Sequence, residues 1–236
     1  MVNQFVVTET NRFGNISGTT ILPLVTEDSV APRAPAILAL VGDSNVSGDQ
    51  VLNRNRLVLI AKADPNAHPL QIASMNQAIR IFRDGVQIGS TIAAADGSWS
   101  FADPDVLGDG VYSYTATATD RAGNESVRSL VFKSLVDTVA PVAPTAFALT
   151  PDTGVVGDSV TFSPAPRFSG QAEPGSLVEV FEKDMFLGSA TADNRGRWGL
   201  DLPSLTDGAH TLRTQSTDLA GNTSDLSTHV IVIDTI

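Results

Sequence analysis

The chain has 236 residues, a formal net charge of −11 at pH 7 and no cysteine. The acidic balance argues against binding to nucleic-acid phosphates, and the lack of cysteine excludes disulfides, zinc thiolates and thiol catalysis. No stretch is apolar over the length that a membrane span needs, so no membrane insertion is expected for this segment. Aromatic residues make up only 6%, beside 19 glycines and 13 prolines, a composition that favours short strands and turns over helices.

Two acidic phrases recur along the chain. Residues 119–126, Thr-Asp-Arg-Ala-Gly-Asn-Glu-Ser, return at 217–224 as Thr-Asp-Leu-Ala-Gly-Asn-Thr-Ser. A second phrase, Asp-Ser/Thr-Val-Ala-Pro, begins at Asp28 and Asp137, and its first residues appear again at Asp234. These starts are 137 − 28 = 109 and 234 − 137 = 97 residues apart. Repetition at such a period indicates tandem domains, which we place at 28–136 (the first repeat) and 137–236 (the second repeat).

Residues 1–27 read as the end of a further repeat. The stretch 5–15 is similar to the end of the later repeats, with Asn11 at the position where they carry aspartate. We therefore interpret residues 1–27 as the C-terminal remnant of a preceding repeat, and the chain as a fragment of a longer, elongated array.

The first repeat alternates apolar and polar residues over 78–82 and 111–118, which predicts strands. Alignment with the second repeat requires an insertion of about ten residues near 67–77. Trp99 follows an Asp-Gly turn and is predicted to lie in the core rather than to serve as a sugar platform. Three aspartates crowd the loop after it and are interpreted as solvated: Asp103, Asp105 and Asp109.

The second repeat shows the same order of elements. Alternation over 177–181 and 209–216 predicts strands, and Trp198 matches Trp99. About seven short strands per repeat, joined by Gly and Asp turns, predict an all-β fold of tandem Greek-key sandwiches. His210 and His229 lie on strand-like stretches and are predicted to be surface residues.

Five motifs occur in the same order in both repeats. They are the opening Asp phrase, an Asp-x(5)-Asp turn, an Ala-Asp/Glu-Pro turn, a turn followed by a Trp strand, and the closing Thr-Asp-x-Ala-Gly-Asn phrase. Each repeat thereby resembles a bacterial Ig-like domain of the kind strung along very large secreted adhesins and related surface proteins. The resemblance implies an immunoglobulin-like sandwich and an extracellular or cell-surface location.

In such a sandwich, the resemblance places the Asp-x(5)-Asp turn at the exit and the Thr-Asp-x-Ala-Gly-Asn turn at the entrance. Acidic side chains would then converge at each junction, where Ca²⁺, which takes six to eight oxygen ligands, could stiffen the array. The alternative is that each aspartate only accepts backbone N–H bonds within its turn. The candidate metal ligands are Asp28, Asp120 and Asn124 at the first junction, Asp43, Asp49, Asp137, Asp218 and Asn222 at the second, and Asp152, Asp158 and Asp234 at the third.

These observations predict a structural spacer that projects a distant binding tip from a bacterial surface. Its immediate partners would be the neighbouring repeats of the same chain, and other regions would contact a host-cell or surface ligand. The alternative is a ligand-binding domain for a glycan or a host protein, with the insertion near 67–77 as the candidate site. No catalytic motif is present and the acidic clusters map to turns, so we predict that the chain is not an enzyme.

Overall fold

The computed structural model describes the chain except residues 1, 24, 43–45, 47 and 63–76. The predicted insertion near 67–77 therefore lies almost wholly outside the described residues. The Cα positions form two compact units: residues 1–38, 60–101 and 114–131 make up one, and residues 39–59, 102–113 and 132–236 the other. The second repeat lies entirely within the second unit and gives the fuller account of the fold.

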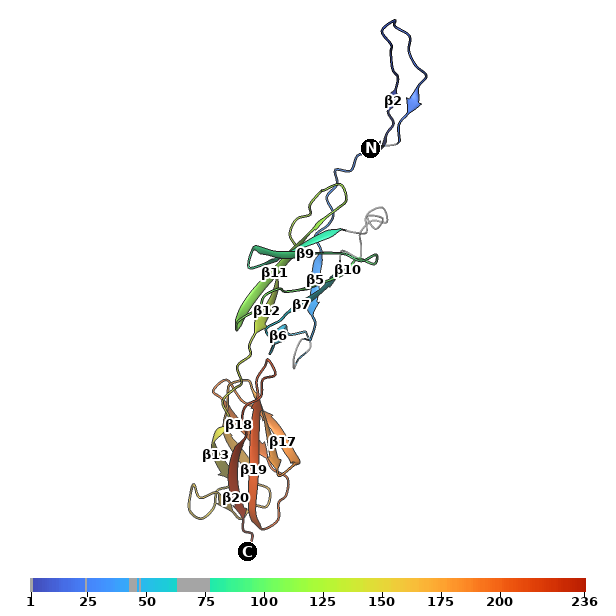
Figure 1. Cartoon of the computed structure of the whole chain (residues 1–236). Helices are drawn as coiled ribbons and strands as arrows, with labels where there is room; N and C mark the ends of the chain where they lie inside the picture. Colours follow the sequence, from blue (N-terminus) through green and yellow to red (C-terminus); the bar gives the residue numbers. More distant parts are fainter. Residues whose placement is uncertain (1, 24, 43–45, 47, 63–76) are drawn as a thin grey trace. The chain divides into compact units, whose positions relative to one another are not determined.

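The second repeat is a sandwich of two mainly antiparallel sheets (Figure 1). Their strand orders are β13-β15-β18 and β14-β20-β19-β16-β17. The all-β prediction is confirmed. The strands are β13 (Thr145–Thr150), β14 (Val160–Thr161), β15 (Arg167–Gln171), β16 (Leu177–Glu182), β17 (Met185–Thr191), β18 (Arg197–Asp201), β19 (Gly208–Thr217) and β20 (Ser227–Ile233).

The core of this sandwich follows from the two-residue period of its strands. In β16, Val178 and Val180 are buried while their neighbours are not. Phe168 is fully buried, and its ring meets Trp198 edge-on with centroids 5.4 Å apart. Trp198 is 4% exposed, which confirms its predicted place in the core. Gly170 permits this packing, since a Cβ there would lie 2.7 Å from the Thr145 carbonyl oxygen and 3.0 Å from the indole.

The Asp-x(5)-Asp turn of the second repeat joins β13 to β14, so it links the two sheets. β14 then pairs in parallel with β20, through Val160 opposite Val232 and Thr161 opposite Ile233. The first strand of the sandwich therefore divides between both sheets around this turn.

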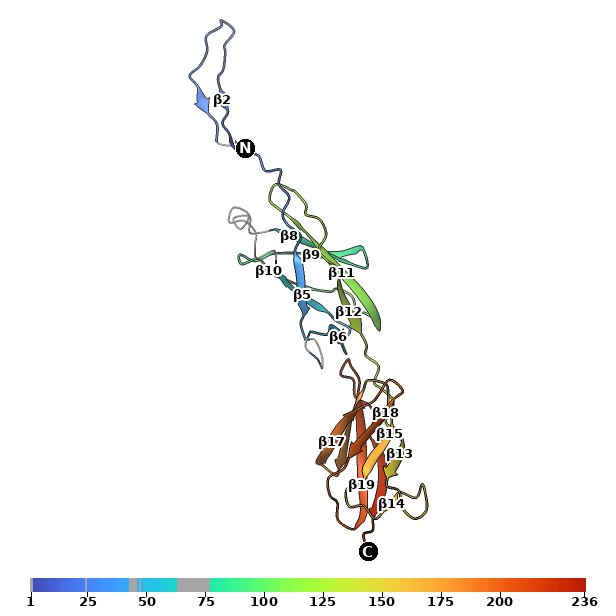
Figure 2. The ribbon, with the colours of Figure 1, turned by 180° about the vertical axis from the view of Figure 1, so that it is seen from behind.

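The first repeat has the same topology, with sheet orders β10-β7-β5 and β6-β12-β11-β8-β9 (Figure 2). β6 again pairs in parallel with the last strand, β12. Trp99 is 4% exposed, as predicted for a core residue. The strands are β5 (Ala36–Leu40), β6 (Val51–Leu52), β7 (Val58–Lys62), β8 (Ala78–Arg83), β9 (Val86–Ile92), β10 (Ser98–Ala102), β11 (Gly110–Thr119) and β12 (Phe132–Val136).

The N-terminal residues form a long hairpin, in which β1 (Val2–Asn3) pairs with β4 (Val25–Thr26) and β2 (Val6–Val7) pairs with β3 (Thr20–Ile21). Its tip has the hydrogen bonds of the repeated turns. The Asn11 side chain accepts from the Asn15 amide at 3.1 Å, as Asp120 does from the Asn124 amide at 2.9 Å. The hairpin thus resembles the closing hairpin of each repeat, while the assignment of residues 1–27 to a preceding repeat stays a prediction.

Three side chains predicted to be exposed are buried or partly buried. His210 is 8% exposed and Asp103 is 4% exposed. Asp103 lies under its loop because its amide bonds the Leu57 carbonyl and its carboxylate accepts the Asp105 amide. His229 packs its ring 5.2 Å from Phe147, and its burial lowers the pKa of the imidazole. The predictions for His210 and Asp103 were wrong because buried positions can hold polar side chains when hydrogen-bond partners are available.

Candidate functional site

The Thr-Asp-x-Ala-Gly-Asn turn of the second repeat is closed by one carboxylate. Asp218, which is 5% exposed, accepts the Asn222 backbone amide through Oδ1 at 2.8 Å and the Asn222 side-chain amide through Oδ2 at 2.8 Å. Gly221 has φ +88°, a conformation that glycine adopts without strain. The aspartate therefore fixes the position of the Asn222 side chain, as the alternative reading of this turn expected.

Asn222 uses its second side-chain hydrogen to bind the linker, because its Nδ2 donates to the Asp137 carbonyl oxygen at 2.8 Å. The first repeat contains the same arrangement, with Asn124 Nδ2 donating to the Asp28 carbonyl oxygen at 3.1 Å. Each turn therefore holds the segment that leads into its own repeat. The Asp and Asn of this motif act as one unit in both copies.

A second aspartate holds the same linker from the preceding repeat. Asp109, before β11, accepts both the Thr138 amide and the Thr138 hydroxyl at 2.9 Å. Asp207, before β19, accepts the Thr235 amide at 3.1 Å and the Thr235 hydroxyl at 2.7 Å. Asp109 is exposed on its loop, as predicted, but its carboxylate also binds the linker, and its equivalent in the second repeat is Asp207.

The linker aspartates also cap their own turns. The Oδ1 atoms of Asp28 and Asp137 each accept the amide two residues ahead at 3.1 Å, and that of Asp234 does so at 3.4 Å. The repeated sequence Asp-Ser/Thr-Val/Ile therefore folds into a short local turn at each linker.

The predicted ligands in the Asp-x(5)-Asp turns are also engaged locally. Asp49 accepts the Val51 amide at 2.9 Å, and Asp158 accepts the Val160 amide at 2.9 Å. Asp152 accepts the Gly157 amide through Oδ2 at 2.6 Å. Asp43 lies outside the described residues. Over the part of the chain that is described, no three His, Cys, Asp or Glu side chains gather as metal ligands.

Glu173, in the Ala-Glu-Pro turn, is a member of the acidic group that the predicted site did not include. The residue is exposed, but desolvation of its carboxyl raises the pKa, and the carboxylates of Asp218 and Asp137 raise it further. The three acids thus lie within electrostatic reach of one another near the linker. The sequence contained a signal for this residue, because the Ala-Asp/Glu-Pro turn recurs in both repeats and carries an acid at the same position in each.

Asp120 carries the corresponding charge in the first repeat. Its burial raises the pKa of the carboxyl, but hydrogen bonds from the Asn124 side chain and from the amides of residues 122–124 outweigh burial and lower it. A lowered acid pKa means that the turn gains stability above the ordinary aspartate value and loses it as the pH falls through the lowered pKa. The hydrogen bonds of the turn therefore stabilise the ionised carboxylate of Asp120.

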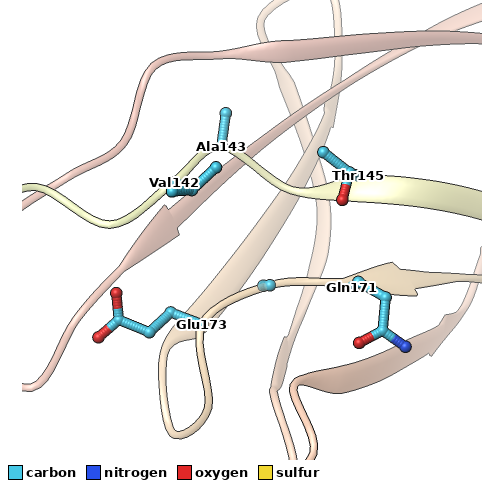
Figure 3. Close-up of a pocket in the computed structure, with 6 residues that line it drawn as sticks. Val142, Ala143, Thr145, Gln171 and Glu173 are labelled. Atoms are coloured by element: carbon cyan, nitrogen blue, oxygen red, sulfur yellow. The ribbon is translucent and has the colours of Figure 1, made fainter.

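The second repeat has a shallow hollow of about 300 Å³ beside Glu173 (Figure 3). It is lined by Val142, Ala143, Thr145, Gln171, Ala172 and Glu173. The side chains of Val142 and Thr145 come from the segment leading into β13 and from its first residue, and Gln171 and Glu173 come from the end of β15 and the turn after it. Its volume is at the lower end of the range for small-molecule sites.

The fold and the linker turns define a tandem array of immunoglobulin-like sandwiches. The chain belongs to the bacterial Ig-like domain family, whose model matches residues 31–138 and again 139–235. Ig-like and fibronectin-like domains are typically structural or binding domains. The part of the chain that is described contains no helix with the length and hydropathy of a membrane span.

Several solved structures are similar to the chain. Fibronectin(III)-like modules of Clostridium thermocellum CbhA are 17% identical, with 81% of this chain and 92% of that chain covered and a TM-score of 0.47. A tetra-tandem repeat in the extending region of a large adhesion protein is 19% identical over 99% of this chain and 67% of that chain, with a TM-score of 0.35. The BSP domain of a biofilm-associated protein is 14% identical over 86% of this chain and 30% of that chain, with a TM-score of 0.30. The comparison with curated proteins found no match.

Proposed function

We propose that the chain is a structural spacer segment of a large bacterial surface or secreted adhesin, which carries a distant binding tip away from the cell. One observation carries this proposal: the Asp137–Thr138 linker is bound by side chains on both sides. Asp109 holds Thr138 from before β11, and Asn222 holds the Asp137 carbonyl from after β19. A linker without such anchors behaves as a flexible coil, whereas a spacer requires its joints to resist bending.

The anchors can be tested separately in the full chain. Asn222→Ala and Asp109→Ala each remove one side of the linker's attachment, so the backbone order parameters of residues 138–140 should fall in each variant and fall further in the double variant. Asn194→Ala, at an exposed turn position, serves as the control for loss of an asparagine side chain. Unchanged order parameters in the double variant would show that the side chains do not restrain the linker.

We also propose that Ca²⁺ binds at the linkers, with oxygen donors from the predicted set. Around the Asp137 linker, the charges of Asp218 and Asp137 repel the carboxylate of Glu173, and this repulsion supports a place for a cation. Oxygen-only donors suit a hard cation, with an expected dissociation constant of about 10⁻⁴–10⁻³ M for extracellular domains. The described carboxylates do not converge as a ligand group, so binding would require them to move together. Asp49 and Asn222, with Asp43 outside the described residues, complete the proposed set at this junction.

The calcium proposal predicts that adding Ca²⁺ raises the melting temperature and increases the radius of gyration relative to the chelated protein. Asp137→Ala should reduce both responses. Glu173→Gln distinguishes two roles of this acid: a ligand loses calcium affinity when replaced, whereas a repelling neighbour stabilises the calcium-free protein when replaced. Identical radii of gyration with and without chelator would contradict stiffening by calcium.

The ligand-binding alternative gains no support from the described residues. Its predicted site, the insertion near 67–77, lies almost wholly outside them. The spacer is therefore the function that the geometry of the linkers supports best.

A further inference from the structure

His210 is a buried, titratable side chain that the spacer function does not use. It is the third residue of β19, and its ring lies on the inward face of the strand with Leu212. Its Nε2 is 2.7 Å from the Thr206 carbonyl oxygen, and its Nδ1 is 2.8 Å from Glu182 Oε1. Both ring nitrogens therefore face oxygen acceptors.

This geometry fixes the protonation that the site prefers. A carbonyl oxygen can only accept, so Nε2 must carry a hydrogen. The Glu182 carboxylate is likewise an acceptor, so Nδ1 must carry a hydrogen as well. An imidazole with both hydrogens is positively charged. When the ring loses that proton, a nitrogen lone pair faces the carboxylate and the hydrogen bond is replaced by repulsion.

In the first repeat, the equivalent bond to the backbone carbonyl four residues earlier is made by a side chain other than histidine. Tyr112 occupies the position of His210, and its hydroxyl donates to the Gly108 carbonyl oxygen at 2.9 Å, four residues earlier, as His210 does to Thr206. A tyrosine that bonds backbone upstream of this strand is a recurrent corner in immunoglobulin-like sandwiches. A phenol donates this bond without taking up an extra proton. The position equivalent to Glu182 in the first repeat is Arg83, so the acidic partner occurs only beside the histidine.

The charged groups around His210 come from several elements. Glu182 ends β16, and Lys183 follows it and opposes a charge on the ring. Asp207, on the loop before β19, is engaged by Thr235. On β20 the residue opposite His210 is the uncharged Ile231, with His229 two positions earlier. Burial acts to lower the pKa of His210, but the hydrogen bonds to Thr206 and Glu182 and the charge of Glu182 outweigh burial and raise it.

We propose that His210 forms a protonation-dependent corner, whose contribution to the stability of the second repeat is present in acidic and lost in alkaline solution, while the tyrosine corner of the first repeat lacks this dependence. The sign follows from linkage. A histidine whose pKa is higher in the folded state contributes its full stability below the unfolded value of about 6.5. That contribution is lost as the pH rises through the raised pKa of the folded state.

The test uses the full chain and resolves the two repeats by two-dimensional NMR. Urea unfolding is followed at about pH 5.5 and about pH 8.5, on either side of the ordinary imidazole value, through amide signals of β19 and, separately, of β11. We expect the urea midpoint reported by β19 to fall at the higher pH by more in the native chain than in His210→Tyr, which installs the corner of the first repeat. Equal falls in the two proteins would overturn the proposal.

Direct titration gives a second measurement that does not depend on the folding of His210→Tyr. The Cε1 proton of His210 is expected to titrate at a higher pH than that of His229 in the same spectra. Glu182→Gln, which keeps the size of the side chain but removes its charge, should move the His210 midpoint to lower pH and leave His229 in place. A His210 midpoint at or below that of His229, or one that Glu182→Gln does not lower, would contradict the proposal.

Discussion

Asp218→Ala is expected to destabilise the second repeat by about 2–3 kcal/mol, because a buried charged acceptor is lost from two hydrogen bonds. The Asn222 amide and side chain would both lose their partner, and the side chain would no longer be positioned to bind the Asp137 carbonyl. The loss should therefore exceed that of Asn222→Ala, which removes the linker bond but leaves the aspartate to cap the turn. Urea unfolding followed through β19 amide signals measures both variants.

Asp225→Ala is the matched control for this prediction. It removes the same charge from an exposed position in the same turn region, and is expected to change stability by less than about 0.5 kcal/mol. If Asp218→Ala were as mild as Asp225→Ala, the turn would not depend on its carboxylate, and the repeated motif would need another explanation.

Phe168→Ala is expected to lower the unfolding free energy of the second repeat by about 3–5 kcal/mol. Phe168 is fully buried, and its ring stacks on Phe147 at 5.4 Å and meets Trp198 edge-on at 5.4 Å. Truncation leaves a cavity between the two sheets that the surrounding strands cannot close without breaking their ladders. Urea unfolding followed through β19 amide signals would report the loss.

Phe162→Ala supplies the control within the same repeat. Phe162 is 62% exposed, so its removal creates no cavity and should change the unfolding free energy by less than about 0.5 kcal/mol. Comparable losses for the two phenylalanines would mean that the packing around Phe168 is not the main source of stability in this sandwich.

The strands and the repeated turns were predictable from the sequence because both depend on local patterns. Alternation over 209–216 marks β19, and the positions of Trp99 and Trp198 follow from their places on strands. The capping role of Asp218 was open as an alternative, because Asp in a turn with Gly and Asn accepts backbone amides in many proteins. Such signals require only neighbouring residues.

The partners of these residues could not be predicted in the same way. Thr138 bonds Asp109 across 29 positions, and Asn222 bonds Asp137 across 85. The alternation of β19 places His210 on the inward face with Leu212. The prediction of a surface residue gave more weight to the polarity of histidine than to this alternation. Glu182, which makes that position tolerable, lies on a strand whose register with β19 is set by tertiary packing.

The parallel pairing of the first and last strands in each repeat has a mechanical consequence. In the second repeat the Val232 and Asp234 amides bond the carbonyls of Ser159 and Thr161, both at 2.9 Å, and Leu135 and Asp137 bond Gln50 and Leu52 at the same distance in the first. The chain enters one strand of each pair and leaves by the other in the same direction. Tension between the two ends of a repeat therefore pulls these strands past each other and loads both hydrogen bonds at once in shear. In an antiparallel pair with both chain ends on the same side, the hydrogen bonds would instead break one after another, under a smaller force.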